Sequence, residues 1–222
     1  IEQPLPAPAH AYIYPRISPD GRRVALTIAE ADRQLWIYDF ARETLTRFTF
    51  DGNGNQELAW SPDGKRIAFS SNKEGAQNIF WQMADGSGGL EQLTTSKNAQ
   101  RPRSFSPDGQ LLTYVEANPS TGNDVWVLHI RDHKAQPFLQ SRFSETVPSF
   151  SPDGHWLSYM SDESGRPEVY VQAYPGPGGK FLISIEGGTE PVWNPNGKEL
   201  FFRIGDAIVA ANIVSQPAFS AG

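Results

Sequence analysis

The sequence predicts an all-β fold, a β-propeller of five four-stranded blades, and three observations support this. The motif Ser-Pro-Asp-Gly begins without change at Ser18, Ser61, Ser106 and Ser151, and Asn194 begins a fifth, altered copy. The copies lie 43 to 45 residues apart, which is about the length of one four-stranded propeller blade. An apolar residue precedes each copy and a short strand-like stretch follows it, a pattern typical of strands joined by tight turns.

The motif has the composition of a β-turn. Proline presets φ at the second position, aspartate can hydrogen-bond back to the backbone, and glycine adopts positive φ. We therefore expect it to join the first two strands of each unit, and we assign no catalytic role to its aspartates. The residues before it should be buried between adjacent blades; they are Ile17, Trp60, Phe105, Phe150 and Trp193.

Taken in order, the chain indicates one propeller domain over residues 1–222, with a proline-rich arm over 1–11. The five repeat units span residues 12–50, 55–94, 100–140, 145–184 and 189–214. The expected strands are 12–17, 22–29, 34–39 and 44–50, then 57–60, 66–71, 78–83 and 90–94, then 103–105, 111–116, 124–130 and 135–139, then 147–150, 156–161, 168–173 and 180–184, and finally 191–193, 199–203 and 207–214. No stretch has a sustained helical period, so we expect negligible helix.

The fifth unit has only three expected strands, because the segment after Val214 is short. We expect residues 3–6 of the arm to supply its outer strand and so to close the ring, since an open sheet edge would leave backbone groups unpaired. An open fragment of a six-bladed ring is the alternative.

Composition excludes several classes of function. The net charge of −6 gives no basic surface for nucleic acid or anionic lipid. The chain has no cysteine, so it has no disulfide framework and no thiolate metal site. No apolar run is long enough to cross a membrane, and we expect no membrane insertion. Ile1 stands where a starting methionine would, and we expect a fragment or a processed product.

Three stretches contain side chains that are candidates for catalysis or metal binding. Ser87 lies in a glycine-rich turn and no Gly-x-Ser-x-Gly elbow occurs. His129 and His133 fall on a strand and then a turn, so they should face different ways and form no zinc pair. Residues 51–57 resemble the start of a calcium loop but lack its flanking helices and its bidentate glutamate. We therefore predict no enzyme activity, no cofactor and no metal.

Residues that enter the first strand of each unit should ring one mouth of the central channel. The candidate ligand-binding residues there are Tyr12, Tyr14, Glu57, Arg101, Arg103, Glu145 and Glu190. We expect Glu57, Arg101, Glu145 and Glu190 at equivalent positions in four units, where ring symmetry would bring them together. Three carboxylates beside one arginine would suit a zwitterionic ligand or a chain terminus.

The repeats resemble those of TolB-type β-propellers, most clearly at residues 60–70, 78–80 and 92–94. Residues 174–180, 187–191 and 197–202 resemble the propellers fused C-terminal to bacterial serine/threonine kinases. This resemblance implies a periplasmic or extracytoplasmic location, possible fusion to a kinase or regulatory domain, and usually six blades. Similar repeats cap prolyl-oligopeptidase-type serine peptidases.

Two functions follow from these features. The leading hypothesis is a non-catalytic interaction or sensor module that binds a protein, a peptide or a small polar ligand at the channel mouth. The alternative is the propeller cap of a prolyl-oligopeptidase-type serine peptidase whose catalytic domain is absent from this sequence. A propeller hydrolase with a metal at the channel is a third reading that the residues support less well.

Overall fold

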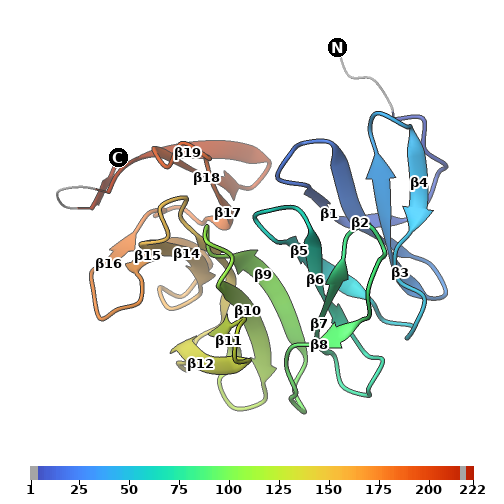
Figure 1. The fold of residues 1–222 in the computed structure, drawn as a ribbon. Helices are drawn as coiled ribbons and strands as arrows, with labels where there is room; N and C mark the ends of the chain where they lie inside the picture. The colour runs from blue at the N-terminus through green and yellow to red at the C-terminus, as the bar shows by residue number, and fades with distance from the viewer. Residues whose placement is uncertain (1–4, 216–218) are drawn as a thin grey trace. The chain divides into compact units, whose positions relative to one another are not determined.

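The computed structural model describes residues 5–215 and 219–222 (Figure 1). In these residues twenty strands form five four-stranded antiparallel sheets, and no helix occurs. The predicted all-β fold with five four-stranded blades is therefore confirmed. None of the described residues forms a helix that is long and apolar enough to cross a membrane.

Each blade uses four strands that are consecutive in the sequence. Blade 1 contains β1 (Tyr12–Ile17), β2 (Arg23–Ala29), β3 (Arg33–Asp39) and β4 (Thr44–Arg47), and blade 2 contains β5 (Gln56–Trp60), β6 (Arg66–Ser71), β7 (Asn78–Met83) and β8 (Glu91–Gln92). Blade 3 contains β9 (Gln100–Phe105), β10 (Leu111–Asn118), β11 (Gly122–His129) and β12 (Lys134–Leu139). Blade 4 contains β13 (Glu145–Phe150), β14 (Trp156–Ser161), β15 (Glu168–Ala173) and β16 (Lys180–Leu182), and blade 5 contains β17 (Thr189–Trp193), β18 (Glu199–Ile204), β19 (Ala207–Val214) and β20 (Ser220–Ala221).

The chain divides into two compact units, Ile1–Pro102 and Arg103–Gly222. The first unit holds blades 1 and 2 and the start of β9. The second unit holds the rest of blade 3 together with blades 4 and 5.

The repeated motif forms the predicted turn between the first two strands of a blade. At the first copy, the Gly21 amide donates to the Ser18 carbonyl at 2.8 Å, and Gly21 has a φ of 69°. The Ser18 hydroxyl donates to Asp20 Oδ1 at 2.6 Å and accepts from the Arg23 amide at 3.0 Å. The other Ser-Pro-Asp-Gly copies repeat this hydroxyl arrangement. The serine hydroxyl lowers the pKa of Asp20 by donating to its carboxylate.

Four of the five residues that precede the turn are buried, as predicted. The indole Nε1 of Trp60 donates to the Arg16 carbonyl at 3.0 Å, and that of Trp193 donates to the Ser149 carbonyl at 3.2 Å. Each tryptophan thus joins its blade to the preceding one. Ile17 corrects the prediction, because its side chain is 66% exposed. It belongs to blade 1, and no strand precedes β1 in the described residues, so Ile17 has no preceding blade on which to pack.

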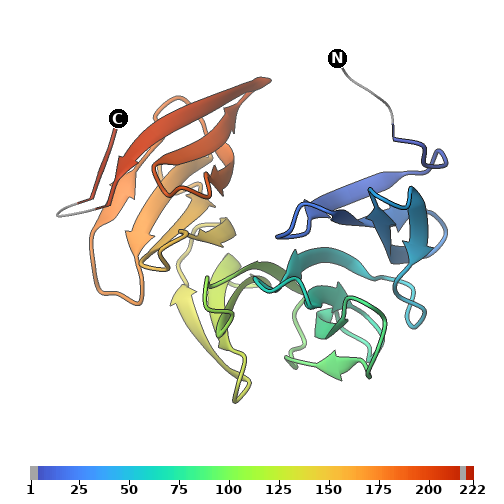
Figure 2. The same cartoon turned by 45° about the horizontal axis from the view of Figure 1, so that its top comes forward.

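The outer strand of blade 5 also differs from the prediction. It is β20, which pairs Ala221 with Ile213 and Ser220 with Val214 of β19 (Figure 2, red, beside the C label). Phe219 fixes this short strand, because its buried ring lies 4.5 Å from the rings of both Trp156 and Phe181, measured between centroids. The segment after Val214 is short, but the buried aromatic ring of Phe219 anchors it, and it therefore forms the outer strand.

The arm was expected to provide that outer strand. Residues 1–4 lie outside the described residues, and residues 5 and 6 belong to no strand. Ala7 packs against the apolar cluster of blade 1, and the Ala11 carbonyl accepts a hydrogen bond from the Ala29 amide at 2.9 Å. The described part of the arm is therefore an extension of blade 1.

Candidate functional site

The first strand of four blades bends at a β-bulge, four residues before the turn motif. The register of the first two strands shifts there in blades 1, 2, 4 and 5. The residue in the bulge has positive φ in each case, 54° at Tyr14, 46° at Glu57, 53° at Val147 and 55° at Glu190. Residues other than glycine rarely adopt this backbone conformation. Its recurrence in four blades identifies it as a structural feature of the repeat that redirects the strand.

The bulge corrects the expected equivalence of the candidate residues. Tyr14, Glu57 and Glu190 occupy the same position in their blades. Arg101 lies one residue further from its turn motif than these three do, and Glu145 lies two residues further. The offsets of Arg101 and Glu145 can be counted in the sequence, whereas the bulge could not be predicted, because no glycine or asparagine marks it.

Glu57 and Arg101 lie together in the first unit. The Nε of Arg101 is 3.3 Å from Oε1 of Glu57, whose side chain is almost fully buried. The Arg101 side chain is 32% exposed. A guanidinium held through Nε keeps its two Nη groups as donors, and these groups match the two oxygens of a carboxylate. This pair is the part of the predicted site that the structure brings together.

Glu145, in the second unit, has a different environment. It is 3% exposed, and its Oε1 accepts a hydrogen bond from the Ser141 hydroxyl at 2.5 Å. Its Oε2 is buried and has no hydrogen-bond partner among the described residues. Burial raises the pKa of Glu145, and the negative charges of Asp124 and Glu163 add to the effect while the Ser141 hydroxyl opposes it. Glu145 is thus a buried carboxyl with a raised pKa.

The other candidates lie nearer the surface. Glu190 is exposed, and its Oε2 accepts from Arg203 Nη1 at 3.1 Å. Such an exposed ion pair contributes little to stability. The Tyr12 hydroxyl donates to the Pro8 carbonyl, whereas Tyr14 is an exposed side chain of the bulge and Arg103 is half-buried in β9.

Sequence reasoning missed the partners Ser141 and Arg203. Arg203 stands opposite Thr189 in the register of β17 and β18, so the strand assignment could have placed it beside Glu190. Ser141 lies in the connection between blades 3 and 4, where neither a period nor a motif constrains the contacts.

Ser87 and the loop over residues 51–57 have local roles in the structure. The Ser87 hydroxyl donates to Asp85 Oδ1 at 2.6 Å within an exposed turn. In the loop over residues 51–57, Asn55 Nδ2 donates to the Asp51 carbonyl at 2.7 Å, and the Asp51 carboxylate pairs with Lys73 at 2.8 Å. Across residues 5–215 and 219–222, no group of three histidine, aspartate or glutamate side chains is arranged to hold a metal ion.

These features define a β-propeller protein built from repeats with a Ser-Pro-Asp-Gly turn. A model of the TolB beta propeller domain family matches residues 8–121 and 101–218, and the chain belongs to this family.

One curated protein is similar to a part of this chain. Dipeptidyl-peptidase 5 of Porphyromonas gingivalis is 34% identical over 89 residues, which are 36% of this chain and 13% of that protein. The chain therefore spans only a small part of this curated relative.

Solved structures share the fold. A putative TolB from Agrobacterium tumefaciens has a TM-score of 0.80 at 20% identity, covering 96% of this chain and 80% of that one. TolB from Acinetobacter baumannii has a TM-score of 0.73 at 18% identity, covering 95% and 53%. A structure from a study of two prolyl endopeptidases has a TM-score of 0.66 at 14% identity, covering 95% and 36%. These likenesses establish the fold alone.

Proposed function

We propose that this chain is a non-catalytic interaction or sensor module that binds a protein, a peptide or a small polar ligand. The observation that carries the proposal is the Glu57–Arg101 pair at the first strands of blades 2 and 3. A buried carboxylate orients the guanidinium, and the partly exposed guanidinium can then bind an anionic group such as a chain terminus. The exposed phenol of Tyr14, on the first strand of blade 1, provides a further polar group.

The experiment is a thermal-shift and calorimetric titration with zwitterionic dipeptides, using their N-acetylated amides as controls. Dipeptides should raise the melting temperature and the blocked amides should not, because the blocked forms lack the carboxylate. The double variant Glu57→Gln/Arg101→Gln should lose the effect, whereas Arg131→Gln, at an exposed arginine of the second unit, should retain it. Equal responses to dipeptides and blocked amides would refute the site.

A second candidate is the propeller cap of a prolyl-oligopeptidase-type serine peptidase. It is favoured by the 34% identity to a segment of Dipeptidyl-peptidase 5. A hydrolase domain in the same polypeptide, with a Gly-x-Ser-x-Gly elbow, would support this candidate. A kinase or regulatory domain there would support the interaction module, and we include such a fusion in the leading proposal.

We also propose a periplasmic or extracytoplasmic location, which rests on the TolB family membership. Fractionation of cells that express the full natural protein tests it, and recovery in the cytoplasm would count against it.

A further inference from the structure

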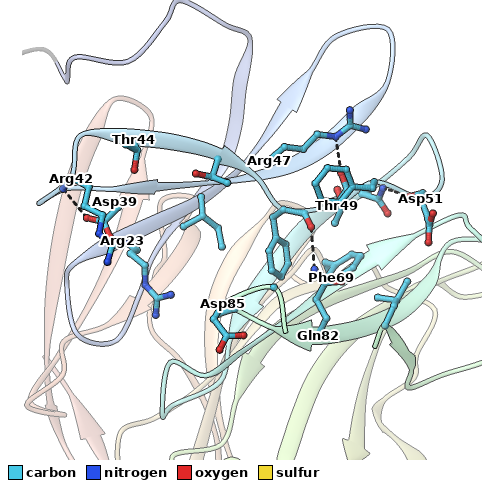
Figure 3. Close-up of a pocket in the computed structure, with 18 residues that line it drawn as sticks. Arg23, Asp39, Arg42, Thr44, Arg47, Thr49, Asp51, Phe69, Gln82 and Asp85 are labelled. Atoms are coloured by element: carbon cyan, nitrogen blue, oxygen red, sulfur yellow. Dashed lines mark hydrogen bonds between the residues drawn. The ribbon is translucent and has the colours of Figure 1, made fainter. Parts of the chain in front are cut away.

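A cavity of about 520 Å³ lies between blades 1 and 2, wholly within the first unit (Figure 3). Its volume is within the range of ligand pockets, about 300–1,000 Å³. Blade 1 contributes the start of β2, strands β3 and β4 and the segment after β4. Blade 2 contributes β6, the end of β7 and the turn that follows it. Neither Glu57 nor Arg101 lines it, so it is separate from the site proposed above.

Three arginines and three aspartates line this cavity, yet no direct ion pair joins one of these arginines to one of these aspartates. The arginines are Arg23, Arg42 and Arg47, and the aspartates are Asp39, Asp51 and Asp85. Within the described part of the chain, none of these arginines lies within 4.0 Å of a carboxylate oxygen. Figure 3 shows Arg23, Asp39 and Arg42 toward one end of the cavity and Asp51 toward the other.

The aspartates are bound by other groups. Asp39 Oδ1 accepts from the backbone amides of Ala41 and Arg42 at 3.0 and 2.9 Å. Asp51 pairs with Lys73. Asp85 Oδ1 accepts from the Ser87 hydroxyl and amide, which lowers the pKa of Asp85, and the positive charge of Arg23 lowers it further. These contacts occupy acceptor positions of the carboxylates, so the carboxylates depend less on the cavity arginines as partners.

The arginines are held by carbonyl oxygens and aromatic rings instead. Arg23 Nη2 donates to the Gly64 carbonyl at 3.2 Å, and its guanidinium lies 5.0 Å from the centroid of the Trp60 ring. Arg47 Nε donates to the Thr49 carbonyl at 2.8 Å, and the Arg47 guanidinium lies over the Phe50 ring. Arg42 is exposed, and its side chain has no partner among the described residues. A guanidinium has five N–H donors, so most of the donors of these three side chains remain available.

Apolar side chains form the rest of the wall. Phe48, Phe69 and Ala84 are buried, Ile37 and Leu90 are half-buried, and all five line the cavity. Positive donors with unused N–H groups thus stand beside apolar surface. We propose that this cavity binds an organic anion, a carboxylate that carries an aromatic or branched apolar group. The arginines bind the carboxylate, and the apolar wall covers the body of the ligand.

The test is a calorimetric and NMR titration of the whole chain with 3-phenylpropionate. The controls are 3-phenylpropionamide, which lacks the charge, and propionate, which lacks the ring; ionic strength is matched throughout. The carboxylate with the ring should bind at least tenfold more tightly than either control. Equal binding of the carboxylate and its amide would overturn the proposal.

Two exposed positions locate the binding. Arg42→Gln should weaken 3-phenylpropionate at least fivefold, whereas Arg131→Gln should not change it. Thr44, an exposed residue of β4 that lines the cavity, permits charge changes of both signs without disturbing the core. Thr44→Glu should weaken binding and Thr44→Lys should strengthen it. Binding that is unaffected by all three cavity variants, with unchanged melting temperatures, would overturn the assignment to this cavity.

The natural carboxylate could be a free small molecule or the end of a peptide, and N-acetyl-L-phenylalanine distinguishes the two. If it binds several-fold more tightly than 3-phenylpropionate, a chain terminus is the source, because the added amide is then recognised. Weaker binding than 3-phenylpropionate assigns the cavity to a small molecule. The Glu57→Gln/Arg101→Gln variant should leave all these affinities unchanged, so failure here and failure of the proposed function are distinguishable.

Discussion

Blade 4 contains two buried glutamates in one cross-strand row, and their acidities shift in opposite directions. Glu145 of β13 and Glu168 of β15 both pair with Ser161 of β14. Their exposures are 3% and 2%. Burial raises the pKa of Glu145, whereas hydrogen bonds outweigh burial at Glu168 and lower its pKa. Equal burial therefore does not set the direction of the pKa shift, and the number of donors does.

The donors differ because the two positions differ in the repeat. Glu168 Oε1 accepts from Arg166 Nε at 2.7 Å and from the Gly187 amide at 2.9 Å, and its Oε2 accepts from the Ser184 hydroxyl. Among residues 5–215 and 219–222, Glu145 accepts a hydrogen bond from the Ser141 hydroxyl alone. Asn55 and Gln100 occupy the place of Glu145 relative to their own turn motifs. Glu145 is thus a carboxyl at a position where two other blades have neutral amides.

The largest expected effect is the loss of the well-bound glutamate. Glu168→Ala removes three hydrogen bonds and leaves the Gly187 amide and the Ser184 hydroxyl without an acceptor. We expect a loss of about 3 kcal/mol in the free energy of unfolding, since each buried unsatisfied group costs about 1–3 kcal/mol. Urea denaturation at pH 7 measures it. The control is Glu190→Ala, which breaks an exposed ion pair and should cost less than about 1 kcal/mol. Equal losses in the two variants would contradict the comparison.

The sequence predicts the blades of this molecule but not the environments of its buried glutamates. The turn motif and its spacing predict all five blades correctly, because turn chemistry and strand alternation are local. The sequence predicts Glu145 and Glu190 as site residues, but it does not predict their environments. These depend on the partners Ser141 and Arg203 and on a bulge that no residue type marks. Ile17 has the same place in the motif as Trp60, and only the neighbouring sheet decides which of the two is buried.

Replacement of the poorly bound glutamate should have the opposite sign. Glu145→Gln puts an amide of the same shape where a carboxylate is buried with one donor, and it removes the repulsion from Asp124 and Glu163. We expect a gain of about 1 kcal/mol at pH 7, the scale of one hydrogen bond to a buried group. The measurement is urea denaturation beside wild type, with Glu145→Asp as a control that keeps the charge. A loss of stability as large as that of Glu168→Ala would show that Glu145 has donors we have not identified.

The pH dependence separates the two glutamates more finely. The pKa of Glu145 is raised in the folded state, so the unfolded chain loses this proton first as pH rises. The stability contributed by Glu145 is therefore present below its unfolded value near 4.5 and is lost as pH rises through its folded pKa. The pKa of Glu168 is lowered, so its contribution is present above its unfolded value and is lost as pH falls through its folded pKa.

The corresponding measurement is the melting temperature of Glu145→Gln and Glu168→Gln from pH 3.5 to 7.5. The advantage of Glu145→Gln over wild type should grow with pH, and the disadvantage of Glu168→Gln should grow with pH as well. Parallel pH profiles for both variants and wild type would mean that neither carboxyl changes its pKa on folding.

The smallest expected effect comes from the bulge, and it tests whether the bulge itself raises the pKa of Glu145. Val147, two residues along β13, has a φ of 53°, which is especially unfavourable for a β-branched side chain. Left-handed backbone costs about 1–2 kcal/mol for residues other than glycine. Glycine removes this cost but adds backbone entropy to the unfolded chain, about 0.5–1 kcal/mol, and it gives up a half-buried side chain. Val147→Gly should therefore gain about 0.5 kcal/mol at most, whereas Val147→Ala, which keeps the strain, should be less stable than Val147→Gly.

The double variant then tests the link to Glu145. If the bulge only redirects the strand, the pH-dependent gain from Glu145→Gln should be the same in the Val147→Gly background. A gain that disappears there would mean that the strained backbone, rather than the lack of donors, separates Glu145 from Glu168.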